Sequence, residues 1–136
     1  MDLTELETDE SLEVEGVWVD LNDKDGTQLL VGRVGSSVFN SALRAKMKPF
    51  RNLIQRDKLP METQEKLLTE VMAEYTLLGW KNLKHAGKQV KFSKAKALEL
   101  LTGIKDFREL VTEIANSMET FRKEELEEDS KNSKAS

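Results

Sequence analysis

The chain has 136 residues, a formal net charge of −4 and no cysteine. This length suits one domain with one hydrophobic core. The absence of cysteine excludes disulfides, thiolate metal sites and cysteine nucleophiles. No apolar run reaches the roughly 18 residues that a membrane span needs, so we expect no membrane contact and a location in the cytoplasm where the protein is made.

The charge is divided unevenly along the chain. Residues 1–15 carry seven acidic side chains and no basic one, whereas residues 16–121 carry 17 basic and 13 acidic side chains. We expect residues 1–13 to form an acidic, flexible arm, because they hold few large apolar groups. The alternative is that this arm folds back on the basic body or masks it. Residues 14–121 are then the single domain, and residues 122–136 a charged, largely disordered C-terminal tail.

A β-hairpin is predicted near the N-terminus. Residues 17–21 and 29–34 are rich in apolar and β-branched side chains, and the Asp25–Gly26 pair between them is typical of a tight turn. Alternation gives this hairpin two apolar faces. One face carries Val17, Val19, Leu21, Leu29 and Val31, and the other carries Trp18, Leu30 and Val34. One face should pack on helices, and the second needs a further cover or a partner.

Apolar residues at helical spacing predict two helices after the hairpin. The first follows the N-cap signal at Ser36 and is kinked or broken at Pro49, whose ring cannot continue the hydrogen-bond ladder. The second begins near Pro60 and ends at about Leu78, where Gly79 follows.

The remaining chain predicts a structured loop and two more helices. Residues 80–92 lack a sustained period and contain anchors at Trp80, Leu83 and Phe92. A third helix runs from Ser93 to Gly103, and a fourth begins at a capping box formed by Asp106 and Glu109 and continues as an apolar stripe to Phe121. The predicted fold class is therefore α+β and mainly helical, with an N-terminal β-hairpin packed on about four α-helices.

The sequence offers no reactive centre. His85 is the single histidine, and no cysteine or carboxylate cluster surrounds it at ligand spacing, so we expect a solvated loop histidine. Residues 32–37 open a helix after a strand, but they lack the lysine and glycine spacing of a P-loop. We therefore predict a non-catalytic binding protein with no catalytic residue, cofactor or metal.

Nucleic-acid binding is the alternative that the charge pattern raises. Residues 81–96 contain six lysines and no acid, and the first helix adds a basic face. Lysine nevertheless dominates where base reading favours arginine, aromatic residues are few, and the isoelectric point is near 5.2. The sequence favours a protein partner over a nucleic acid.

Several stretches resemble one protein family. Residues 15–21 and 29–35 look like the opening hairpin of the tail assembly chaperones of long-tailed (siphovirus-like) bacteriophages. Further similar stretches are residues 39–43, 48–50, 77–83, 92–93, 97–101 and 106–111, so the likeness covers about residues 12–130. These are packing and turn residues, and it is their order and spacing that carry the likeness.

The resemblance implies a chaperone of virion assembly. Such proteins bind the long tape measure protein, keep it soluble, help recruit tail tube subunits and are absent from the finished tail. It therefore implies action in the host cell cytoplasm and absence from the mature virion. A structural tail terminator or adaptor protein is a further alternative, and the sequence leaves homo-oligomers open.

We expect partner binding on two surfaces. The first is the second hairpin face, formed by Trp18, Leu30 and Val34, unless the arm or a helix covers it. The second is the basic face of the first helix, formed by Arg44, Lys48 and Arg51, which suits an acidic client segment.

Overall fold

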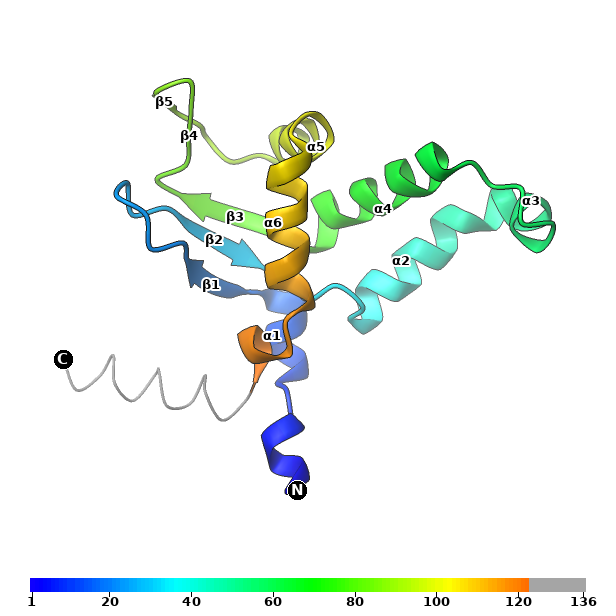
Figure 1. Cartoon of the computed structure of the whole chain (residues 1–136), viewed down its shortest axis with the longest axis horizontal. Helices are drawn as coiled ribbons and strands as arrows, with labels where there is room; N and C mark the ends of the chain where they lie inside the picture. The colour runs from blue at the N-terminus through cyan, green and yellow to red at the C-terminus, as the bar shows by residue number, and fades with distance from the viewer. Residues whose placement is uncertain (123–136) are drawn as a thin grey trace.

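The computed structural model describes residues 1–122 and shows an α+β, mainly helical protein (Figure 1). In chain order its elements are η1 (Leu3–Leu6), α1 (Glu10–Glu15), β1 (Val17–Asp20), β2 (Gln28–Val31), α2 (Ser37–Met47), η2 (Lys48–Phe50), α3 (Arg51–Gln55), α4 (Met61–Tyr75), β3 (Leu77–Lys81), β4 (Lys84–His85), β5 (Lys88–Gln89), α5 (Lys94–Gly103), α6 (Lys105–Asn116) and η3 (Met118–Phe121). The labels η denote short 3-10 helices.

The predicted hairpin is confirmed. Strands β1 and β2 are antiparallel, with Trp18 opposite Leu30. Leu29 and Val31 are fully buried, whereas Trp18 is 44% exposed, so the two faces separate as the alternation predicts. The inner face packs on the helices, and the outer face carries Trp18.

The predicted second helix is too long, because residues 77–81 form a third strand. Helix α4 ends at Tyr75, and β3 pairs antiparallel with β2, which becomes the central strand of the order β1-β2-β3. Gly79 lies opposite Leu30 inside this strand and does not end a helix. The apolar run at residues 77–80 suits a helix or a strand by pattern alone, and pairing with β2 decides between them.

Helices α2 and α4 form a helical hairpin that projects from the sheet, with α3 at its tip (Figure 1). The Ser36 hydroxyl accepts a hydrogen bond from the Phe39 amide at 3.3 Å, which caps α2 as predicted. Pro49 lies in the turn η2, where the helix breaks and then resumes as α3.

The C-terminal helices follow the predicted positions with two corrections. Helix α6 ends at Asn116, and the predicted continuation to Phe121 forms the separate 3-10 helix η3. The Ser93 hydroxyl accepts a hydrogen bond from the Lys96 amide at 3.0 Å and caps α5. The capping box predicted at Asp106 and Glu109 is wrong, because α6 begins at Lys105 with Ile104 in the cap position. Asp106 instead lies in the first turn, where its charge favours the helix dipole.

The C-terminal part of the predicted N-terminal arm is attached to the body, from Thr8 onward. The predicted boundary after residue 13 falls inside α1. Glu13 Oε1 lies 2.6 Å from Arg33 Nη1 and accepts a 2.6 Å hydrogen bond from the Thr8 hydroxyl, and Arg33 sits 5.9 Å from the centroid of the Phe121 ring. Residues 8–15 therefore fold back on the body, which is the alternative to a flexible arm that the sequence analysis raises. Of the predicted C-terminal tail, residues 123–136 lie outside the described residues.

Three consecutive amides hold the end of β2 against other elements. Gly32 N donates to Thr76 O at 2.8 Å, Arg33 N donates to Glu13 O at 2.8 Å, and Val34 N donates to Ala115 O at 3.1 Å. These bonds join the sheet to α1, to the turn between α4 and β3, and to α6. We call residues 32–34 the amide junction.

Gly32→Ala tests the tightness of this junction. A Cβ at Gly32 would clash with the Tyr75 carbonyl oxygen and lie 3.2 Å from Glu13 O, so the backbone would have to move. We expect a loss of about 2–3 kcal/mol in the free energy of unfolding. In the matched Gly103→Ala variant the new Cβ meets nothing within 4 Å, so we expect a change within about 1 kcal/mol. Urea denaturation followed by circular dichroism measures both, and equal midpoints would contradict the close approach.

Glu13→Ala tests the attachment of α1. The Glu13 and Arg33 side chains are 12% and 26% exposed, so removal of the carboxylate leaves a poorly solvated guanidinium. We expect a loss of about 1–3 kcal/mol in unfolding free energy. The exposed Lys105–Glu109 pair, at 3.9 Å, is the control, and Glu109→Ala should change stability by less than about 0.5 kcal/mol. The same denaturation experiment reports both variants, and a Glu13 effect as small as the control would show that the pair contributes little.

Candidate partner-binding surfaces

The outer face of the sheet presents an indole laid across three strands. Trp18, Leu30 and Gly79 are successive neighbours in register across β1, β2 and β3. Because Gly79 has no side chain, Trp18 Cη2 approaches to 3.7 Å from the position that a Cβ would occupy there. The indole therefore extends from β1 over Leu30 to β3 and remains 44% exposed.

Two further side chains complete this surface. Lys81 Nζ lies 4.2 Å from the centroid of the Trp18 ring, a cation–π contact that holds the indole flat and adds a positive charge. The Leu30 and Leu78 side chains both reach Gly16, since a Cβ there would meet each at 3.0 Å. We call the set formed by Trp18, Leu30, Leu78, Gly79 and Lys81 the outer sheet face.

Strand β1 is an edge strand of the sheet beside the indole. Leu21 N donates to Thr27 O at 3.0 Å, and antiparallel pairing alternates, so the backbone groups of Trp18 and Asp20 point away from β2. Within residues 1–122, no strand pairs with that edge. An extended segment could therefore find main-chain donors and acceptors next to Trp18.

The turn of the hairpin is held by a carboxylate. Asp23 accepts hydrogen bonds from the Thr27 amide at 2.8 Å and the Thr27 hydroxyl at 2.7 Å. These bonds favour the ionised carboxylate and lower the pKa of Asp23 below its ordinary value. The Thr27 hydroxyl is also 3.1 Å from Asn82 O, which ties this turn to the end of β3.

Val34 does not share this face, contrary to the prediction. Strand β2 ends at Val31, and the Val34 amide bonds to Ala115 O in the amide junction. Its half-buried side chain packs against the core. The alternation that placed Val34 beside Leu30 stops at Gly32, where the chain leaves the sheet.

The predicted basic residues gather at a second place. Arg44, Lys48 and Arg51 line a shallow hollow at the junction of α2, η2 and α3, together with apolar Met47 and Ile54. All three cations are exposed. This basic hollow lies on the projecting helical hairpin, well away from the sheet (Figure 1). The structure therefore separates the two predicted groups into two surfaces.

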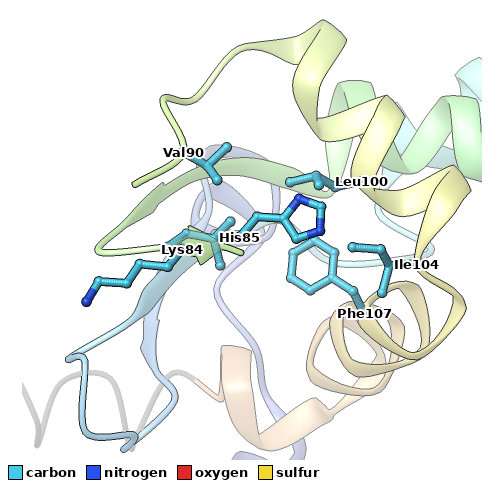
Figure 2. A pocket seen from close by; sticks show the side chains of 7 residues that line it. Lys84, His85, Val90, Leu100, Ile104 and Phe107 are labelled. Atoms are coloured by element: carbon cyan, nitrogen blue, oxygen red, sulfur yellow. The ribbon is translucent and has the colours of Figure 1, made fainter. Parts of the chain in front are cut away.

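The sequence did not reveal a third feature, an apolar cavity under the β4–β5 ribbon. It has a volume of about 210 Å³ and is partly open to solvent. Its lining residues are Leu83, Lys84, His85, Val90, Leu100, Ile104 and Phe107. His85 is exposed, as the sequence predicts, but Figure 2 shows its ring beside Leu100, Ile104 and Phe107, a contact that the sequence does not reveal. We call this space the His85 cavity.

Contacts on both sides of the ribbon fix its position over the cavity. Trp80 Nε1 donates to Val90 O at 2.7 Å, and the Trp80 and Phe92 rings meet edge to face with centroids 4.8 Å apart. The turn between β4 and β5 uses positive φ at Ala86 and Gly87. The sequence predicts the turn at these residues and the apolar stripe that contains Phe107, but it does not predict that the two lie side by side.

Two kinds of feature are absent from the described residues. In residues 1–122, no group of three or more histidine, cysteine, aspartate or glutamate side chains is placed to hold a metal ion. None of the helices formed by these residues is long and apolar enough to cross a membrane.

Comparison with known proteins gives one match. The YdaY prophage protein family matches residues 34–132, and no curated protein or solved structure matches the chain. The matched range contains the basic hollow and the His85 cavity, and it begins after the β1–β2 hairpin. Because this range is more than half of the 136 residues, the chain belongs to the YdaY prophage protein family and is a phage-related protein.

Proposed function

We propose that this phage-related protein is a tail assembly chaperone that binds the tape measure protein, keeps it soluble and helps recruit tail tube subunits. The observation that carries the proposal is the outer sheet face, where a 44% exposed tryptophan lies on β1, the edge strand of the sheet in residues 1–122. Exposed aromatic surface of this kind commonly anchors a protein partner. The stretches that resemble the tail assembly chaperones support the same function.

The outer sheet face provides a binding mode for an extended client. A client segment pairs with the backbone groups of Trp18 and Asp20 that point away from β2 and adds a strand to the sheet. Its apolar side chains contact Trp18 and Leu30, and Lys81 favours an acidic residue nearby. Main-chain pairing tolerates many sequences, which suits a long client with many similar segments. The proposed action is binding alone, without catalysis or a cofactor, in the host cell cytoplasm and before the tail is complete.

The basic hollow offers a second contact. Arg44, Lys48 and Arg51 surround apolar Met47 and Ile54, an arrangement that suits an acidic amphipathic segment. Exposed charges mainly raise the association rate and its salt dependence. In this proposal the hollow attracts the client, and the outer sheet face holds it.

The contacts of the lysines favour this function over nucleic-acid binding. Lys84 pairs with Asp25 at 3.3 Å, and Lys96 pairs with Glu99 at 2.9 Å. Lys94 donates to Glu74 O at 2.8 Å, and Lys81 lies on the Trp18 ring. Four of the six lysines in residues 81–96 are therefore already engaged, and few remain for phosphate groups.

Trp18→Ala tests the proposed anchor. Co-production with the tape measure protein of the same phage should raise the soluble fraction of that protein, and Trp18→Ala should weaken its capture by about tenfold or more. Leu68→Ala, on α4 and 37% exposed, is the matched control and should leave capture unchanged. Pull-down at a series of client concentrations measures the affinity, and circular dichroism checks that each variant is folded.

Other outcomes would point to other functions. If a folded Trp18→Ala variant captured the client as well as the wild type does, the outer sheet face would not be the anchor. If the client stayed insoluble when co-produced with the wild-type chain, the proposed chaperone function would be wrong. A DNA affinity that falls steeply with salt would favour the nucleic-acid-binding alternative. Presence of the chain in purified virions would favour a structural tail terminator or adaptor.

A further inference from the structure

Residues 1–7 are the exposed part of the predicted arm, and from here on the name acidic arm refers to these seven residues alone. The arm carries Asp2, Glu5 and Glu7 and no basic side chain. Leu3 and Leu6 are 70% and 43% exposed. Its backbone hydrogen bonds, such as Glu5 N to Asp2 O at 3.1 Å, join its own residues.

The arm leaves the body at a fixed point. Thr8 bonds to Glu13, and the Asp9 amide donates to Phe121 O at 3.1 Å, so the arm begins where residue 8 is held. In Figure 1, η1 projects beyond α1, at the opposite end of the body from the β4–β5 ribbon. The arm of one copy therefore does not lie near the His85 cavity of the same copy.

The His85 cavity has the complementary chemistry. Its lining is apolar apart from Lys84 and His85, and it contains no acidic side chain. Lys88, opposite His85 in the ribbon, and Lys91, next to Val90, have no acidic partner among residues 1–122. A volume of about 210 Å³ exceeds that of cavities of roughly 150 Å³ that take up benzene, so a leucine side chain fits.

We propose that the acidic arm of one copy docks on the His85 cavity of a second copy. Leu3 or Leu6 enters the cavity, and the carboxylates of Glu5 and Glu7 face Lys88 and Lys91. The arm and the cavity are different surfaces, so the contact is head-to-tail, and successive copies form a ring or an open chain. This inference goes beyond the proposed function, because it concerns self-association and requires no client.

A labelled arm peptide tests the contact directly. The probe is the acetylated peptide of residues 1–8 with a fluorophore at its C-terminus, and the receptor is the full chain carrying Leu3→Ser and Leu6→Ser, whose own arm cannot compete. We expect saturable binding by fluorescence anisotropy, weakened about tenfold or more when both leucines of the peptide are serine. Binding should also weaken several-fold as salt is raised, because opposite charges are screened.

Charge exchange locates the contact on the receptor. The receptor with Lys88→Glu and Lys91→Glu should bind the native peptide more weakly. A peptide with Glu5→Lys and Glu7→Lys should bind this charge-reversed receptor more tightly than it binds the receptor that keeps both lysines. The control is Lys58→Glu with Lys66→Glu, two exposed lysines away from the cavity, which should leave binding unchanged. Equal binding to both double variants would overturn the assignment to the cavity.

Sedimentation of the full chain supplies the second readout. The mass of the wild-type chain should rise with concentration, and this rise should be lost with Leu3→Ser and Leu6→Ser and with Lys88→Glu and Lys91→Glu. The inference would be overturned if the anisotropy of the labelled peptide did not rise as receptor is added. It would also be overturned if the wild-type chain and both double variants had the same mass at every concentration. Capture of the tape measure protein is measured separately, so failure of self-association leaves the proposed function standing.

Discussion

The amide junction at residues 32–34 is the constraint on which the arrangement of the sheet and helices depends. Buried amides must find acceptors, and here three successive donors bond to Thr76 O, Glu13 O and Ala115 O. The acceptors belong to three segments that are far apart in sequence. Gly32 permits the approach, because any side chain at that position would meet the backbone of Tyr75. The end of the central strand thereby fixes where α1, the α4–β3 turn and α6 lie.

The same constraint explains why one face of the sheet stays accessible. The junction draws α6 and the end of α4 to the side of the sheet that carries Leu29 and Val31, both fully buried. A small sheet with helices on one side leaves its other side to solvent unless a partner covers it. Trp18, laid across Leu30 and Gly79 and held by Lys81, reduces the exposed apolar area without removing it. The outer sheet face is thus a consequence of the fold, and its indole is already oriented before any partner arrives.

Local signals in the sequence were sufficient for much of this fold, and long-range contacts account for the rest. The hairpin, the separation of Trp18 from buried Leu29 and Val31, the cap at Ser36 and the break at Pro49 depend on neighbouring residues, and the sequence predicts all of them. Strand β3 was not, because an apolar run after α4 becomes a strand only when β2 offers an unpaired edge. Val34 was misplaced because its amide bonds to α6 and ends the alternation. Of the candidate surfaces, the positions of Trp18 and of the basic residues could be predicted, whereas the His85 cavity depends on where the β4–β5 ribbon lies over α5 and α6.

The distribution of charge bears on the surfaces that lie far apart in the folded chain. The net charge of −4 combines strongly acidic residues 1–15 with a basic body, and folding neutralises only part of this difference. Glu13 pairs with Arg33, whereas the acidic arm projects at the opposite end of the body from the β4–β5 ribbon, which carries lysines. Opposite charges that cannot meet within one molecule attract a second one, and exposed leucines beside the acids add an apolar contribution to that attraction. The uneven charge therefore supports both proposed contacts, one with a client and one with a second copy of this chain.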